Sequence, residues 1–263
     1  MLVAAVDTAT LTLSCALVDV EPGGAARLRC EKLEHLGAAP GAKAARRDPG
    51  AGTRSTHSAR LPQALVELLQ VEGLAIPDVA GYAVGLGPGS FTGLRIGLAT
   101  WKGLAYANRR PIAGASSLAA MALAAAPDAG PGAILVPLLD AKKGEVYAGF
   151  YRVAGGGIVE VADDAALPPE ALAARIEALR GEGSSPVVFG QGLGAYPAVL
   201  GTVPRLATEV ATPTALAVAA LVAERVTTAA YDAQALFALE PRYVRPSEAE
   251  LKFPRGLGPG AGN

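Results

Sequence analysis

The chain has 263 residues and a formal net charge of −1 at pH 7, with 51% hydrophobic and 18% charged residues. This composition is typical of a globular protein with one large core or two modest ones, and it provides no strong positive field for holding nucleic acid. No apolar run reaches the roughly 18 residues that a membrane-spanning helix needs. Two cysteines, Cys15 and Cys30, are too few for an oxidised secreted scaffold, so we expect a cytoplasmic protein.

Apolar runs rich in β-branched residues predict strands at the start of the chain. These strands cover residues 2–6, 11–18 and about 26–32. After His57 the spacing becomes helical, with one apolar stripe of Leu61, Ala64, Leu65, Leu68 and Leu69. A strand at about 79–86 and a helix at about 91–108 complete this half. Residues 37–55 are rich in glycine and lack periodicity, which predicts a mobile loop.

The same order of elements returns in the second half of the chain. Strands are expected at 133–139, 145–153, 158–161 and 187–190, and helices at 116–126, 169–181 and 213–226, the last capped by Thr212. Both halves contain the order βββαβα, which predicts an α/β protein with two lobes, residues 1–110 and 111–227. The segment at about 228–250 could pack back on the N-terminal lobe, and the glycine- and proline-rich tail at 254–263 should be disordered.

Glycines concentrate in the run GPGSFTGLRIG at residues 87–97, between a predicted strand and a predicted helix. Their spacing misses the dinucleotide-binding pattern by one residue, and no Gly-Lys-Ser/Thr follows, as a phosphate-binding loop requires. Taken by itself, the run favours a tight turn at Gly87 and Gly89. At Gly93 and Gly97 it favours close approach of a neighbouring backbone.

As a whole, this run resembles the signature of the bacterial TsaB family, also called YeaZ, the accessory subunits of tRNA threonylcarbamoyladenosine synthesis. Further segments resemble that family in the same order: VDTAT at 6–10, HSARLP at 57–62, WKGLA at 101–105, SSL at 116–118, LDAKKGEVYA at 139–148 and PRYVR at 241–245. The resemblance implies the two-lobe ASKHA fold of the actin, hexokinase and Hsp70 superfamily, which is built from duplicated βββαβα units.

Catalytic members of this superfamily end their first strand in an Asp-x-Gly-Thr loop that approaches nucleotide phosphates. The corresponding loop here begins at Asp7 and ends at Thr10, and Ala9 replaces the glycine, so a Cβ restricts the approach of a phosphate. Asp7 and Thr10 could instead cap the turn between the first two strands through their side chains. The two interpretations are a vestigial nucleotide cleft and simple turn chemistry.

Asp140 occupies the position of a second phosphate or metal carboxylate in such enzymes. It could face the cleft opposite Asp7 as a cation ligand through water, or it could be a surface acid paired with Lys142. Gly190 and Gly192 resemble the glycine-rich element beneath an adenosine in superfamily kinases, although glycine turns of this kind are common.

Metal chemistry is where the chain departs from the catalytic TsaD family, which carries a His-x-x-x-His pair at the start of a helix. His57 matches the first histidine, but Leu61 stands four residues later, and His35 lies elsewhere. One imidazole is too few for a zinc or iron site, so no metal is predicted. Without an H-E-x-x-H or G-x-S-x-G motif, neither a zinc nor a serine protease mechanism can be assembled.

The helix at 91–108 carries small residues four positions apart, a pattern that allows close contact with another helix. Packing rules alone leave open whether both of its faces are buried internally. In the TsaB family, the two helices of the first lobe pack against those of the TsaD-type subunit, and the same surface supports homodimers. Carried over, the partner-binding residues are Leu61, Leu65, Leu68, Gly93, Arg95, Gly97, Leu98, Trp101 and Lys102.

The resemblance therefore implies a non-catalytic subunit of the complex that makes N6-threonylcarbamoyladenosine at position 37 of tRNA. It would support the TsaD-type subunit beside a TsaE-type ATPase, and it would reach tRNA only through the complex. It would have no intrinsic cofactor, with ATP or ADP at a subunit junction. One alternative is an ATP-binding transferase or kinase acting on its own through Asp7 and Asp140, and another is a scaffold that works as a homodimer.

Overall fold

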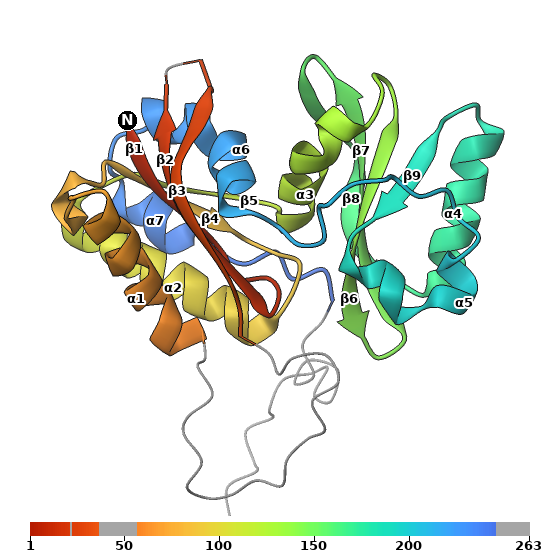
Figure 1. The fold of residues 1–263 in the computed structure, drawn as a ribbon, viewed down its shortest axis with the longest axis horizontal. Coiled ribbons are helices and arrows are strands. Elements are labelled where there is room, and N and C mark those ends of the chain that lie inside the picture. Colours follow the sequence, from red (N-terminus) through yellow and green to blue (C-terminus); the bar gives the residue numbers. More distant parts are fainter. Residues whose placement is uncertain (22, 37–56, 246–263) are drawn as a thin grey trace, which may run out of the picture.

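The computed structural model of the protein describes residues 1–21, 23–36 and 57–245. Two β-sheets stand side by side, each flanked by helices (Figure 1). The strand order is β3-β2-β1-β4-β5 in the first sheet and β8-β7-β6-β9 in the second. This arrangement agrees with the predicted two-lobe α/β fold. The loop predicted at 37–55 and the tail predicted at 254–263 lie outside the described residues.

The first sheet combines an antiparallel meander with two parallel strands. Its strands are β1 (Leu2–Asp7), β2 (Thr12–Val20), β3 (Ala26–His35), β4 (Gly81–Gly85) and β5 (Ile112–Ala115). β1 pairs antiparallel with β2 and parallel with β4. β1 is buried from its second residue onward, whereas the edge strand β3 alternates between half-buried and exposed residues. A fully buried strand needs cover on both faces of the sheet.

Successive side chains of β1 enter different cores, because strand side chains point alternately to opposite faces. Ala4 and Val6 pack with helices α1 (His57–Val71), α2 (Phe91–Asn108) and α7 (Ala233–Ala238). Val3 and Ala5 pack on the other face with α6 (Ala215–Thr228). All five residues of the stripe predicted for α1 are buried, and α2 has the predicted bounds.

The second sheet has its own two cores. Its strands are β6 (Ile134–Lys142), β7 (Glu145–Ala154), β8 (Gly157–Leu167) and β9 (Pro186–Phe189). One face packs with α4 (Pro169–Gly181) and α5 (Pro197–Leu200). The other face packs with α3 (Ser117–Ala125), which lies between the two sheets (Figure 1). Ala120 of α3 belongs to the core beneath α6, so α3 contacts both halves of the molecule.

Two elements that the sequence placed in the C-terminal lobe pack on the first sheet. β5 pairs with β4, and α6 covers the face opposite α1 and α2. The N-cap of α6 is Thr214 rather than the predicted Thr212, since Thr214 Oγ1 accepts from the Ala217 amide at 3.4 Å. The small apolar residues of α6 pack with those of β1, β2 and β4 in one core. The boundaries at residues 110 and 227 remain a prediction.

Candidate functional site

The glycine run forms a tight turn between β4 and α2. Gly87 adopts φ +90°, a conformation that favours glycine, and Gly89 lies so close to Ala9 that a Cβ would collide with the Ala9 carbonyl. The Ser90 amide donates to that carbonyl oxygen at 2.6 Å, and Ser90 Oγ caps α2 by accepting from the Gly93 amide at 3.2 Å. The turn is therefore fastened to the β1–β2 loop.

Helix α2 lies directly against Thr8 at two glycines. A Cβ on Gly93 would collide with the Thr8 carbonyl oxygen, and a Cβ on Gly97 would collide with Thr8 Oγ1. Thr8 Oγ1 donates to the Gly93 carbonyl at 2.8 Å. The close backbone approach expected at these glycines is confirmed at Gly93, whereas the close neighbour of Gly97 is a side chain. Both glycines are buried inside the lobe, so the structure gives their assignment to a partner interface no support.

Asp7 is held by groups of the chain itself. It is 1% exposed, Oδ1 accepts from the Ala9 amide at 2.8 Å, and Oδ2 accepts from Ser117 Oγ at 2.6 Å. Burial raises the pKa of Asp7 to about 6, although the hydrogen bonds from Ser117 and Ala9 oppose this rise. Thr10 Oγ1 accepts from the Thr12 amide at 3.0 Å. These contacts match the turn-capping interpretation of Asp7 and Thr10.

The other residues assigned to a nucleotide cleft also have structural roles. The backbone amide of Lys142 donates to Asp140 Oδ1 at 2.8 Å, and the Lys142 ammonium group donates to Asp140 Oδ2 at 2.5 Å. This is the pairing that the surface-acid alternative predicted. Gly190 has φ +101°, and a Cβ on Gly190 or Gly192 would collide with the backbone of Leu138. Within the described part of the chain, no three His, Cys, Asp or Glu residues gather in a way that could hold a metal ion.

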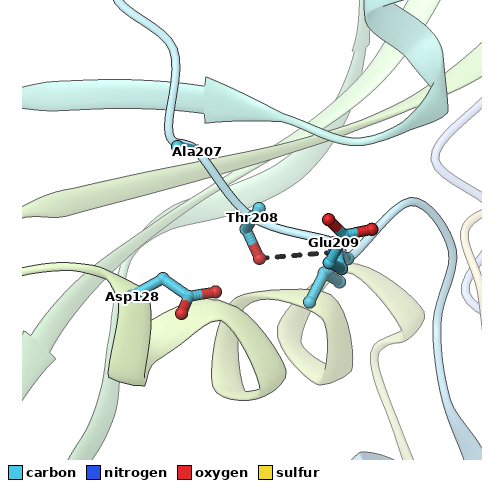
Figure 2. Close-up of a pocket in the computed structure, with 5 residues that line it drawn as sticks. Asp128, Ala207, Thr208 and Glu209 are labelled. Atoms are coloured by element: carbon cyan, nitrogen blue, oxygen red, sulfur yellow. Dashed lines mark hydrogen bonds between the residues drawn. The ribbon is translucent and has the colours of Figure 1, made fainter.

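A hollow of about 630 Å³ lies at a different place, where the chain after β9 passes the end of α3 (Figure 2). Its lining residues are Asp128, Ala207, Thr208, Glu209 and Val210. None of the residues assigned to the nucleotide cleft is among them. The hollow has two carboxylates and no basic side chain in its lining, so it disfavours the phosphates of a nucleotide.

Most of the predicted partner-binding side chains are in the core. Leu61, Leu65, Leu68, Leu98 and Trp101 are between 0% and 6% exposed. The indole Nε1 of Trp101 also donates to the Ala4 carbonyl oxygen of β1 at 2.8 Å. The apolar faces of both helices pack on the first sheet, so these five side chains belong to the core of the lobe and are not exposed to a partner in this structure. Of the predicted set, Arg95 is exposed and Lys102 is half-buried.

The exposed side of α2 carries aromatic and basic groups that pack against the C-terminal part of the chain. We call this surface the aromatic strip; it consists of Phe91, Arg95, Lys102, Tyr106, Phe237 and Tyr243. The four aromatic side chains are between 44% and 62% exposed. At the other end of α2 from Phe91, Tyr106 lies 5.6 Å from Phe237 between ring centroids. Lys102 Nζ donates to the Phe237 carbonyl oxygen at 2.9 Å.

Arg95 organises the N-terminal end of the strip. Its guanidinium lies 4.1 Å from the centroid of the Phe91 ring, and its Nε donates to the Tyr243 hydroxyl at 3.0 Å. The rings of Phe91 and Tyr243 are 5.3 Å apart between centroids. Sequence reasoning missed these aromatic residues. Phe91, Arg95, Lys102 and Tyr106 share one face of α2 by helical spacing, which is the signal that could have found them.

The two-sheet fold, with helices on both faces of each sheet, is that of the actin, hexokinase and Hsp70 superfamily. The model of one protein family, TsaD, tRNA N6-adenosine threonylcarbamoyltransferase, matches residues 51–191. A solved structure of YeaZ from Pseudomonas aeruginosa has a TM-score of 0.68 and 27% identity, and the match covers 92% of this chain and 99% of that one. The chain therefore belongs to the TsaD family and, within it, to the TsaB proteins, also called YeaZ.

Curated relatives carry the name tRNA threonylcarbamoyladenosine biosynthesis protein TsaB. The Escherichia coli K12 protein is 36% identical over 142 residues, which are 54% of this chain and 60% of that protein. The Bacillus subtilis 168 protein is 35% identical over 111 residues, 42% of this chain and 47% of that protein. The matched segments thus span about half the length of these relatives. In the part of the chain that the structure describes, we find no helix with the length and hydropathy needed to cross a bilayer.

Proposed function

We propose that this protein is a non-catalytic subunit of the complex that makes N6-threonylcarbamoyladenosine at position 37 of tRNA. In this proposal it binds and supports a TsaD-type catalytic subunit in the cytoplasm. One observation carries the proposal: the chain keeps the family fold while exposing the aromatic strip on α2. Aromatic residues and arginine are the types most enriched among residues that dominate binding energy at protein interfaces.

The internal contacts of Asp7 and Asp140 support the non-catalytic part of the proposal. Both oxygens of Asp7 accept hydrogen bonds from the chain itself, and Asp140 is neutralised by Lys142. A carboxylate that holds a magnesium ion must offer oxygens to the metal or its waters. We therefore propose that the chain has no intrinsic cofactor and that ATP or ADP binds at a subunit junction of the complex.

The other proposed partners are tRNA, a TsaE-type ATPase and a second copy of the chain. The net charge and the aromatic strip bear on the first and the last of these. A net charge of −1 favours contact with tRNA through the other subunits rather than directly. A TsaE-type ATPase would join the TsaD-type subunit in the complex. In the absence of that subunit, the aromatic strip of one copy would pack on a second copy, so the homodimer and the heteromer would compete for one surface.

The test is to mix the protein with the TsaD-type subunit of the same genome and measure the mass of the complex by light scattering. Ala99 lies on the exposed side of α2, between Arg95 and Tyr106 by helical spacing. Ala99→Trp should weaken binding by at least about tenfold, because the indole would obstruct the strip. The matched control is Ala178→Trp on the exposed side of α4, in the other lobe, which should bind normally.

If the wild-type mixture gives only the masses of the two separate proteins and no mass of a complex, the proposal is contradicted. Equal weakening by Ala99→Trp and Ala178→Trp would contradict the assigned surface. ATP turnover by the isolated protein that disappears in Asp7→Ala would instead favour a transferase or kinase of the superfamily. The homodimer is tested in the same experiment, since added TsaD-type subunit should displace it.

A further inference from the structure

The last described residues, 241–245, run across the junction between the two sheets, and we call them the C-terminal strap. Their contacts alternate between the two halves of the molecule. On the side of the first sheet, the Arg242 amide donates to the Leu86 carbonyl oxygen at 2.7 Å, directly after β4. Tyr243 then lies against Phe91, and its hydroxyl accepts from Arg95 of α2.

On the side of the second sheet, the two arginines of the strap bind carboxylates of β7 and β8. The Arg242 guanidinium lies 3.4 Å from Asp164 Oδ2 and 4.0 Å from Glu160 Oε1. Arg245 donates to Glu145 Oε2 at 3.0 Å and to the Ala141 carbonyl at 3.3 Å. Arg242 and Arg245 thus contact the second sheet, and Tyr243, which lies between them in the chain, contacts α2.

Asp164 is the point where the strap reaches the interior of the junction. Its side chain is 1% exposed, and it accepts from Ser116 Oγ at 2.6 Å and from the Tyr151 hydroxyl at 2.5 Å. Burial raises the pKa of Asp164, and the hydrogen bonds and the charge of Arg242 oppose that rise. Ser116 and Tyr151 are neutral donors, so Arg242 is the partner that supplies positive charge to this carboxylate.

Helix α3 packs apolar residues on both halves of the molecule, and the strap is a further connection between the halves, at Asp164. Among the described residues, the apolar cores belong to one sheet or the other, and α3 contributes to a core of each. Beside α3, hydrogen bonds of Ser116 and Ser117 connect the two halves. Domains within one chain move relative to each other by default, unless their interface is large and hydrophobic. A bridge that is fastened on both sides restrains such a motion.

We propose that the C-terminal strap sets the angle between the two lobes and couples that angle to the aromatic strip. Tyr243 is part of the strip, and its neighbour Arg242 is part of the lobe junction. A ligand of the strip that contacts Phe91, Arg95 or Tyr243 would therefore favour one lobe angle, and a fixed lobe angle would favour that ligand in return. The coupling to a protein partner rests on the function proposed above, whereas the restraint on the lobes does not.

The restraint is measured in the isolated protein by the distance between two spin labels, one on each lobe. Gln70→Cys at the exposed end of α1 and Ala178→Cys on α4 would carry the labels, with Cys15→Ala and Cys30→Ala removing the native thiols. We expect a single narrow distance distribution in the labelled parent. Arg242→Ala and Tyr243→Ala should each broaden or shift it.

Tyr106→Ala is the matched control, because Tyr106 is an exposed aromatic residue of the same strip that stacks outside the strap. Its distance distribution should equal that of the parent. If Arg242→Ala does not fold, Arg245→Ala replaces it, since that variant loses only a partly exposed ion pair and one carbonyl contact. Unchanged distributions in the strap variants that fold would overturn the proposal.

The coupling is measured by titrating the parent and Arg242→Ala with the TsaD-type subunit. We expect an affinity at least about fivefold lower for Arg242→Ala, the lower end of typical coupling between sites. Equal affinities would overturn the coupling. If the parent forms no complex, the proposed function fails, and the strap proposal is then decided by the distance distributions alone.

Discussion

Gly97 of α2 packs directly on the side chain of Thr8, so that a single added methyl group would collide with Thr8 Oγ1. We expect Gly97→Ala to destabilise the protein by about 1–3 kcal/mol, as overpacking of a tight site typically does. Gly103 is the matched control on the same helix, because a Cβ there meets open space. Gly103→Ala should stabilise the fold by about 1 kcal/mol through helix propensity. Urea unfolding of both variants distinguishes the two environments, and equal effects would contradict this packing.

Asp7 should make stability depend on pH in an unusual direction for a carboxylate. Its pKa is about 6 in the folded protein, against an ordinary value of 3.8, so the folded protein binds the proton more tightly than the unfolded chain does. The stabilisation from this site is complete below about pH 4 and is lost as the pH rises through about 6. The shift of about two pKa units corresponds to about 3 kcal/mol.

Asp7→Asn isolates this contribution, because the amide stays neutral at every pH and keeps an oxygen for the Ala9 amide. The stability of the wild type relative to Asp7→Asn should fall between about pH 4 and pH 6 and then level off. Asp164 has a raised pKa as well, and Asp19 and Glu67 have lowered pKa values, so only the difference between the two proteins is informative. Parallel stability curves would show that Asp7 titrates normally.

Trp101 is the single tryptophan of the chain, and it is fully buried beneath the first sheet. Trp101→Phe removes the donor to the Ala4 carbonyl and leaves unfilled volume, which should cost about 2 kcal/mol or more. Tyr106→Phe on the exposed strip serves as the control and should change stability by less than about 0.5 kcal/mol. Thermal unfolding followed by circular dichroism measures both. A loss below about 0.5 kcal/mol in Trp101→Phe would contradict the buried hydrogen bond.

Ser90 and Ser116 each cap the start of a helix, and their removal should have unequal costs. Ser90 accepts one amide at the start of α2, so Ser90→Ala should cost about 1 kcal/mol. Ser116 accepts the Leu118 and Ala119 amides at the start of α3 and also donates to buried Asp164. Ser116→Ala should therefore cost about 2–4 kcal/mol, because it removes the cap and also a buried hydrogen bond to a carboxylate. Guanidinium unfolding curves would show the difference, and equal midpoints would argue against the role of Asp164.

Local patterns in the sequence predict much of the fold. Helix α2 has the ends expected for it because Ser90 caps its start and Arg109, in a left-handed conformation, closes its end. The buried stripe of α1 follows from helical spacing in the same way. The path of α6 could not be predicted, since its place on the first sheet depends on a return across the junction. Sequence order alone does not specify that return.

The candidate site was harder to predict than the fold. An apolar stripe shows that a helix face is covered, but it does not tell whether a sheet or a partner covers it. The family resemblance assigns Leu61, Leu98 and Trp101 to an interface, whereas in the structure they belong to the core. The pairs Phe91–Tyr243 and Tyr106–Phe237 join residues far apart in the chain, and no local spacing predicts such contacts.

Ser116 and Ser117 are neighbours in the chain, yet each hydrogen bonds to a carboxylate in a different half of the molecule. These two hydrogen bonds depend on the length of the connection between β5 and α3. Inserting one residue after Ala115 would rotate the start of α3 and direct the wrong serine at each carboxylate. The β7–β8 hairpin, by contrast, has open space around Gly155 and Gly156. Loop grafts and affinity tags should therefore be tolerated at that hairpin and rejected where the two lobes meet.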